Sequence, residues 1–158
     1  MKNKMVLIIG VVVILFSGIF ILNNMKNKKV VDNEANPYGD KKLHQETIDQ
    51  LNDPLYQNII TKENLDLALE NKEDITVYYF SPTCVHCINT TPIVTPLVDE
   101  LGIDMKKMNM LEYEGLSHYD LEGTPTIIHY EKGVEVARFE GSSEEEEFRK
   151  FFEQYVIK

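Results

Sequence analysis

Apolar and polar positions divide the chain into a long apolar run, a polar stretch and a region of short alternating segments. Residues 5–22 form the apolar run and contain no charged side chain. A helix rises about 1.5 Å per residue and about 20 residues cross the hydrocarbon core of a membrane, so this run nearly spans it. We expect residues 1–22 to be an uncleaved transmembrane anchor. The alternative is a cleaved signal peptide, but the apolar core is long for one and residues 23–26 offer no small-residue cleavage site.

The stretch that follows is polar and shows no apolar periodicity. Residues 23–42 are rich in Asn, Lys and Asp and contain a proline and a glycine, which predicts a linker. Residues 43–53 place a few apolar positions among polar ones, which predicts a weak helix. We therefore assign residues 23–54 to a linker with a pre-domain helix, and residues 55–158 to one folded domain.

From residue 55 onward, β-branched and aromatic runs alternate with amphipathic segments. The runs predict five strands, at residues 55–60, 75–80, 104–110, 126–130 and 134–139. The amphipathic segments predict four helices: one that begins at Thr61 or Lys62, one over 84–101, one over 112–121, and a last one capped by Ser142 or Ser143. The early alternation implies parallel strands with crossover helices, and the late hairpin adds an antiparallel edge. The predicted fold class is α/β, with a central mixed sheet flanked by helices.

Charge limits the classes of partner. The formal net charge is −10, and five of the 16 basic residues lie before residue 30, where no acidic residue occurs. The rest of the chain therefore carries 26 acidic and 11 basic residues, a net charge of −15. Nucleic-acid binding needs clustered lysines and arginines, so we expect no nucleic-acid partner. The ordinary role of such a charge is solubility.

The clearest chemical signal is the pair of cysteines, Cys84 and Cys87, which are the only two in the chain. They directly follow the predicted strand at residues 75–80 and open the next helix. The positive end of a helix and its unpaired N–H groups favour a thiolate, and the Cys-x-x-Cys spacing lets two sulfurs reach disulfide geometry. This pattern predicts redox chemistry. A purely structural disulfide would close too small a loop to constrain the unfolded chain much, and a zinc site would need two more ligands.

The order of the two thiols predicts their roles. Cys84 is the expected nucleophile, because the N-terminal thiol is better placed to feel the helix end and its N–H groups. Cys87 is the expected resolving thiol, which attacks a mixed disulfide and releases the partner. His86, if protonated, adds positive charge beside the pair. A stabilised thiolate makes the disulfide more oxidising.

Residues 55–157 resemble the thioredoxin superfamily. The motif Cys84-Val85-His86-Cys87 stands at the active-site position of that family, and Pro92 stands where its members have a proline that kinks the active-site helix. The order of predicted strands and helices is that of the thioredoxin fold. The resemblance implies that fold, and a redox-active disulfide between Cys84 and Cys87 in place of any other cofactor or metal.

A second motif carries the same resemblance. Gly123-Thr124-Pro125-Thr126 is similar to the family loop in which a cis-proline faces the disulfide. The resemblance implies a cis bond before Pro125, which exposes the backbone of Thr124 to pair with a bound peptide. Val85, His86, Thr124 and Pro125 are thus the expected supporting residues of the site.

The sequence departs from the family pattern at three places. Many thioredoxins carry a buried acid where this chain has Tyr78, and a tryptophan where it has Thr83. Between the cysteines it has Val-His in place of Gly-Pro, and a histidine there is similar to protein disulfide isomerases and periplasmic disulfide oxidases. These departures point away from a general cytoplasmic reductase and slightly favour oxidation or isomerisation.

Together, the anchor and the thiol pair are similar to membrane-anchored, extracytoplasmic thioredoxin-like oxidoreductases of bacteria. The lysines on the two sides of the apolar run nearly balance, so the charge rule does not decide orientation. We place the domain outside the cytoplasmic membrane by analogy with ordinary signal-anchors. The expected partners are exported thiol or disulfide-containing proteins and an unidentified membrane redox protein. The alternatives are a reductase, for example in cytochrome c maturation, a non-catalytic accessory module of a membrane complex, and a redox sensor.

Overall fold

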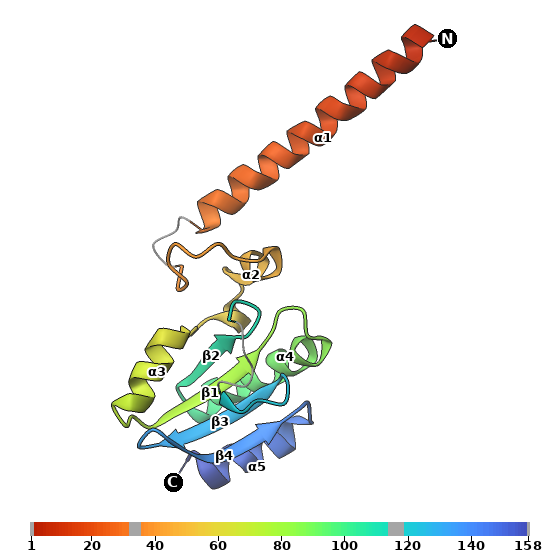
Figure 1. Ribbon diagram of the computed structural model, residues 1–158. Coiled ribbons are helices and arrows are strands. Elements are labelled where there is room, and N and C mark those ends of the chain that lie inside the picture. The colour runs from red at the N-terminus through yellow and green to blue at the C-terminus, as the bar shows by residue number, and fades with distance from the viewer. Residues whose placement is uncertain (1, 32–35, 114–118, 158) are drawn as a thin grey trace. The chain divides into compact units, whose positions relative to one another are not determined.

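The structure is a computed structural model that describes residues 2–31, 36–113 and 119–157. The chain forms two compact units, Met1–Asp40 and Lys41–Lys158. The first consists mainly of one helix, and the second is a mixed α/β domain (Figure 1).

Helix α1, Lys2–Val31, accounts for most of the first unit. Its segment Met5–Leu22 has a mean hydropathy of 3.1, and none of it is buried within the chain. Apolar side chains that are not buried within their own chain gain no hydrophobic stabilisation in water. Such a helix is therefore suited to another apolar environment. By length and composition it fits a membrane anchor or a signal sequence. The helix extends to Val31, so residues 23–31, which we assigned to the linker, are helical.

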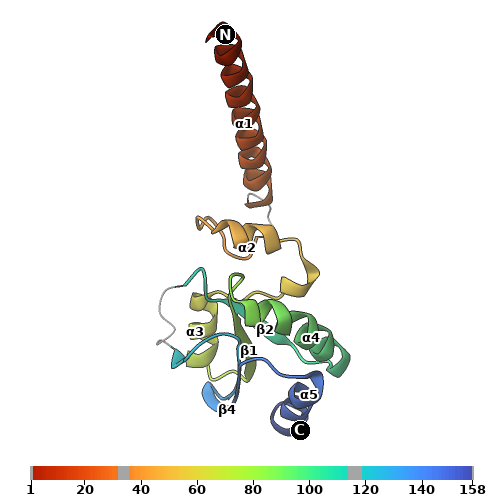
Figure 2. The ribbon, with the colours of Figure 1, turned by 90° about the vertical axis from the view of Figure 1, so that its right-hand side faces the viewer.

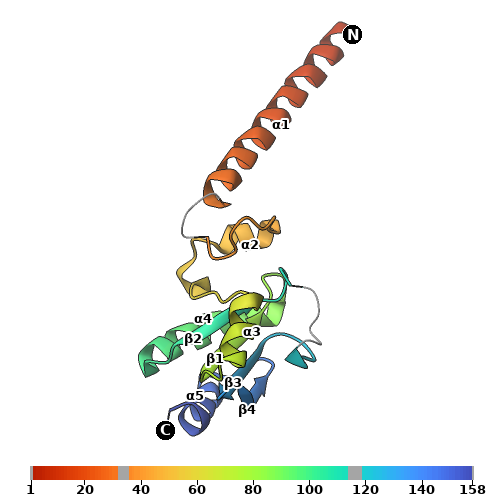
Figure 3. The ribbon, with the colours of Figure 1, turned by 60° about the vertical axis from the view of Figure 1, so that its left-hand side comes forward.

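The second unit is built on a sheet of four strands in the order β2-β1-β3-β4 (Figure 1 and Figure 3). The strands are β1, Ile75–Phe80; β2, Met105–Asn109; β3, Thr126–Glu131; and β4, Val134–Glu140. Strand β1 is parallel to β2 and antiparallel to β3, and β3 is antiparallel to β4. The predicted mixed sheet with a late antiparallel hairpin is confirmed. Strand β1 lies in the interior of the sheet, which suits its continuous apolar sequence.

Helices cover both faces of this sheet (Figure 2). They are α3, Lys62–Glu70; α4, Val85–Leu101; and α5, Glu145–Tyr155. Helices α4 and α5 pack on the face that carries Tyr78 and Phe80 of β1, and α3 packs on the face that carries Val77 and Tyr79. Alternation along β1 therefore divides the interior into two hydrophobic cores.

The predicted first strand, at residues 55–60, is wrong. Pro54–Tyr56 form a short 3-10 turn, η1. Only Ile59 makes a strand-like contact, an isolated parallel bridge to Lys107. The reason is Asn58, whose φ of 64° lies in the left-handed region and interrupts the extended backbone. The weak helix predicted over residues 43–53 is present in shorter form as α2, Gln45–Gln50.

Two helix predictions in the second half of the domain also change. Of the helix predicted over 112–121, residues 112 and 113 form a bend and residues 114–118 lie outside the described part of the chain. The last helix, α5, is capped by Glu144 and not by Ser142 or Ser143, and Glu144 makes no side-chain capping bond. The acidic residues Glu145, Glu146 and Glu147 lie in its first turn and complement the positive helix end.

Candidate active site

Strand β1 delivers the cysteines to the edge of the sheet where the parallel strands end. After Phe80, a short turn is closed by the main-chain N–H of Cys84, which donates to the carbonyl of Ser81 at 3.1 Å. Cys84 is then the N-cap of α4, with an extended backbone. A cap residue normally satisfies a free N–H of the first turn with a side-chain oxygen. Here the sulfur of Cys84 takes that place and accepts from the N–H of Cys87 at 3.3 Å.

The loop before β3 lies against the Cys84 sulfur from the other side. The thiol of Cys84 donates to the carbonyl oxygen of Thr124 over 3.2 Å. The Thr124–Pro125 peptide bond is cis. Thus the structure brings together two motifs that lie 40 residues apart in the chain, and the sulfur contacts main-chain atoms of both.

The two thiols, both unpaired in this structure, differ strongly in burial and acidity. Burial opposes ionisation of Cys84, but hydrogen bonds from Cys87, from Thr124 and from two main-chain N–H groups outweigh it and lower the pKa of Cys84. Cys87 is only 1% exposed, and burial, reinforced by its bond to Cys84, raises its pKa to about 12. Since the thiolate is the reactive form, Cys84 is better suited to attack than Cys87.

Cys87 is held from behind by two hydroxyl groups. The hydroxyl of Thr91 donates to the carbonyl of Cys87 at 2.8 Å. The hydroxyl of Tyr78 lies 3.1 Å from that of Thr91. Tyr78 is completely buried, and burial raises its pKa far above the ordinary value. The position that holds an acid in many thioredoxins is therefore occupied here by a neutral hydroxyl.

The two residues between the cysteines face solvent. Val85 is 62% exposed, and Ile88, one turn of α4 further on, is 48% exposed. They place apolar surface beside the reactive sulfur. The side chain of His86 is also exposed. Its carbonyl, in contrast, accepts a hydrogen bond from Ser142 at 3.2 Å.

The pre-domain segment, residues 41–50, lies at the end of β2, at the same edge of the sheet, and no sequence pattern predicts this. The side-chain amide of Asn109 donates to the buried hydroxyl of Thr47 at 3.0 Å. The main-chain N–H of His44 donates to a carboxylate oxygen of Glu112 at 3.0 Å, and Lys41 donates to the carbonyl of Glu112. Because these partners are more than 60 residues apart, no local pattern reports them.

Two other contacts of the site are absent from the sequence-based predictions. Thr91 follows Cys87 by four residues in a helix, a spacing at which threonine hydroxyls reach the preceding turn, so this contact was open to prediction. The contact of Ser142 with His86 spans 56 residues and has no such signal.

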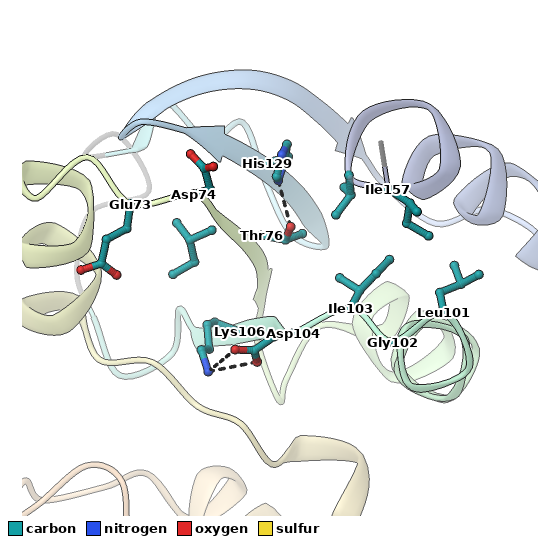
Figure 4. A pocket seen from close by; sticks show the side chains of 12 residues that line it. Glu73, Asp74, Thr76, Leu101, Gly102, Ile103, Asp104, Lys106, His129 and Ile157 are labelled. Atoms are coloured by element: carbon teal, nitrogen blue, oxygen red, sulfur yellow. Dashed lines mark hydrogen bonds and ion pairs between the residues drawn. The ribbon is translucent and has the colours of Figure 1, made fainter.

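A pocket of about 520 Å³ lies at the opposite end of β1 (Figure 4). Its lining includes Thr76, Asp104, Lys106 and His129, and neither cysteine. The hydroxyl of Thr76 bonds to His129 at 2.9 Å, and Lys106 pairs with Asp104 at 2.9 Å. These polar groups bind one another at the end of β1 away from the cysteines. In the described ranges, no group of three His, Cys, Asp or Glu side chains is arranged to hold a metal ion.

Comparisons with known proteins agree with this geometry. The chain is 30% identical to protein disulfide-isomerase 1 of Caenorhabditis elegans over 81 residues, which cover 48% of this chain and 17% of that protein. It is 31% identical to protein disulfide-isomerase A4 of Rattus norvegicus over 80 residues, which cover 47% of this chain and 12% of that protein. The chain thus spans less than a fifth of the length of these two relatives.

The comparisons also identify the domain. A mutant thioredoxin from Halobacterium salinarum NRC-1 has the same fold, with a TM-score of 0.52 and 21% identity, covering 62% of this chain and 88% of that chain. A family model described as Thioredoxin matches residues 57–154, more than half of the chain and the whole region that builds the cysteine site. The chain therefore belongs to the thioredoxin family.

Proposed function

We propose that this protein is a membrane-anchored thiol-disulfide oxidoreductase that exchanges disulfides with exported proteins through Cys84 and Cys87. The observation that carries the proposal is the asymmetry of the two thiols. Cys84 is partly exposed, with a lowered pKa, and Cys87 is buried directly behind it, with a raised one. An attacking thiol and a protected resolving thiol are what two-step disulfide exchange requires.

The exchange proceeds through one mixed disulfide. The Cys84 thiolate attacks a sulfur of a substrate disulfide, whose S–S bond breaks, and the other substrate sulfur leaves as a thiolate and takes a proton. Cys87 then loses its proton and attacks the Cys84 sulfur, which releases the second substrate thiol. The products are a substrate dithiol and the Cys84–Cys87 disulfide, so two electrons pass from the protein to the substrate. The reverse sequence oxidises a substrate dithiol.

Two features favour the oxidising or isomerising direction. Hydrogen bonds that stabilise the Cys84 thiolate stabilise the reduced protein, and this makes its disulfide a stronger oxidant. Tyr78, whose hydroxyl contacts that of Thr91, occupies the position that holds an acid in many thioredoxins, so no carboxylate at this position can take the proton of Cys87. The named relatives are protein disulfide-isomerases, which agrees with this direction.

The groups around the site support peptide binding, and helix α1 supports the proposed location. The carbonyl of Thr124, beside a cis-proline and Cys84, is placed to pair with an extended substrate peptide, and the exposed apolar groups of Val85 and Ile88 would contact its side chains. The apolar span of α1 supports attachment to a membrane. We place the domain on the extracytoplasmic side of the cytoplasmic membrane by analogy with ordinary signal-anchors. There, an unidentified membrane redox protein would restore the active form of the cysteine pair.

The test is activity of the full chain in detergent micelles, measured by insulin reduction and by refolding of reduced ribonuclease. Cys84→Ser should abolish both activities, and Cys87→Ser should accumulate a mixed disulfide with substrate. Tyr155→Phe, a change on the far part of α5, serves as the matched control. Full activity of Cys84→Ser in both assays would reject the proposed enzyme activity and favour the alternative of a non-catalytic accessory module.

Direction and location need separate measurements. Equilibration of the cysteine pair with glutathione gives its potential, which should lie nearer to about −120 mV, as in a strong oxidase, than to about −270 mV, as in thioredoxin. In intact cells, a membrane-impermeant maleimide should label Cys84 if the domain is extracytoplasmic. Labelling only after the cells are lysed would place the domain inside.

A further inference from the structure

We infer that Ser142 is a positioning residue for the reactive thiol, acting through the peptide group between His86 and Cys87. This inference rests on the proposed function, because it concerns how the attacking thiolate is stabilised. Ser142 lies in the loop between β4 and α5, far from the cysteines in sequence. From the sequence, Ser142 is predicted only as a helix cap, and Glu144 takes that place in the structure.

The central observation is that one peptide group links Ser142 to Cys84. The hydroxyl of Ser142 donates to the carbonyl of His86 at 3.2 Å. The N–H of Cys87 donates to the sulfur of Cys84 at 3.3 Å. The carbonyl of residue 86 and the N–H of residue 87 belong to the same planar amide, whose atoms move together. Ser142 therefore holds one end of the group whose other end binds the reactive sulfur.

This link acts on the thiolate in two ways. A hydrogen bond at the carbonyl oxygen polarises the amide and strengthens its N–H as a donor, by about 10–30% per bond. It also fixes the plane of the amide, so that the N–H stays aimed at the Cys84 sulfur. Both effects stabilise the charged form of Cys84 more than the neutral form, because a charged acceptor gains more from the bond.

A buried hydroxyl orients Ser142. Thr90, in the first turns of α4, donates its hydroxyl proton to Ser142 at 2.9 Å, and Thr90 is only 1% exposed. Because the Ser142 oxygen accepts from Thr90, its own proton is directed to His86. Ser142 thus occupies a defined place in a chain of donors that ends at the reactive sulfur.

The residue before Ser142 ties the same loop to the other half of the site. The N–H of Gly141 donates to the carbonyl of Pro125 at 2.8 Å. Pro125 follows Thr124, whose carbonyl accepts from the Cys84 thiol. Two successive residues of one loop therefore hold the start of α4 and the cis-proline loop, the two segments between which the Cys84 sulfur lies.

The experiment is the pH profile of Cys84 alkylation by iodoacetamide in the reduced full chain, followed by peptide mass spectrometry in detergent micelles. Ser142→Ala should shift the midpoint to higher pH and slow alkylation below the midpoint by about threefold, a part of the worth of one hydrogen bond. Ser142→Thr, which retains the hydroxyl, should restore the profile. Ser143→Ala is the matched control and should match the wild type.

A second variant keeps the test independent of the first. Thr90→Val preserves the shape of the side chain but removes the donor to Ser142, and should shift the midpoint in the same direction by a smaller amount. Unchanged midpoints in Ser142→Ala and Thr90→Val would overturn the inference. Inactivity of the wild-type protein on insulin and ribonuclease would refute the proposed function. The pH profile of Cys84 alkylation could still be measured and compared between variants, because alkylation needs no turnover.

Discussion

The hydroxyl of Tyr78 lies 3.1 Å from the hydroxyl of Thr91, which in turn donates to the carbonyl of Cys87. The contact is completely buried and joins the central strand to the active-site helix. Because burial raises the pKa of Tyr78 far above the ordinary value, this side chain stays neutral at physiological pH and cannot act as a base. Its role at this position is structural.

Replacement of Tyr78 by Phe should therefore affect stability more than chemistry. The lost hydrogen bond should reduce the free energy of unfolding by about 1 kcal/mol. The pH profile of Cys84 alkylation should stay that of the wild type, because Thr91 keeps its bond to Cys87. Urea unfolding of the full chain in micelles measures the first quantity. A shifted alkylation profile would show that Tyr78 does act on the thiols.

The buried thiol of Cys87 should make the reduced domain less stable in alkali. Its pKa of about 12 in the folded protein exceeds the value of about 8.5 for an unfolded cysteine. The folded form thus keeps a proton that the unfolded form loses, so this contribution is complete below pH about 8.5 and is lost as pH rises toward about 12. At pH about 9.5 the loss amounts to about 1.4 kcal/mol.

Urea unfolding of the reduced full chain at the two pH values measures this effect. The variant Cys87→Ala has no thiol at this position and should lose about 1.4 kcal/mol less than the wild type between pH about 7.5 and about 9.5. The tyrosines are common to both proteins, so their titration cancels in the comparison. Equal losses in the two proteins would mean that Cys87 ionises as readily in the folded state as in the unfolded one.

The carboxylate of Glu112 should hold the pre-domain segment on the domain. Its side chain is 1% exposed and lies 3.3 Å from the imidazole Nδ1 of His44. It also accepts a hydrogen bond from the main-chain N–H of His44. Hydrogen bonds to charged groups contribute about 1.5–3 kcal/mol, so Glu112→Ala should speed hydrogen exchange at residues 41–50 by about tenfold or more. Asp49→Ala, on an exposed position of α2, is the control. Exchange at the wild-type rate in Glu112→Ala would show that other contacts hold the segment.

Two glycines with similar backbone angles should respond differently to alanine. Gly133 has φ of +76°, and a Cβ there would lie 2.1 Å from the carbonyl oxygen of Leu69. Gly141 has φ of +82°, and a Cβ there would meet no atom within 4 Å. Gly141→Ala should cost only the left-handed backbone, about 1–2 kcal/mol, and Gly133→Ala should cost about 1–3 kcal/mol more through overlap. Thermal unfolding of the two variants tests the order, and equal costs would contradict it.

Elements with strong and uniform local signals could be predicted from the sequence. Strand β1, Ile75–Phe80, has the predicted bounds because every residue in it fits a buried strand and charged residues precede it. Helix α4 could be predicted because its apolar positions repeat at helical spacing through Pro92 and Pro96. It begins at Val85, one residue after the predicted start, because Cys84 is its N-cap. The cis bond before Pro125 followed from the family resemblance and not from any physical pattern.

Other elements could not be predicted, because tertiary structure decides them. The apolar residues at 55–60 have strand propensity, but the left-handed backbone at Asn58 leaves room for one bridge only. Ser142 has the chemistry of a helix cap, yet its hydroxyl is engaged by His86 and Thr90. Within the site, the sequence shows that Cys84 and Cys87 are the two thiols. It does not show that the partners of the Cys84 sulfur are main-chain atoms from two distant segments.

That last feature has a consequence for how such a site can diversify. Two hydrogen bonds of the Cys84 sulfur use main-chain atoms, the N–H of Cys87 and the carbonyl of Thr124, and every residue other than proline offers both groups. Substitutions at Val85 or His86 therefore alter the outer surface and leave these two main-chain bonds in place. The surface around the cysteines can therefore vary while the thiol-disulfide chemistry persists, so a change of specificity does not require a new reactive centre.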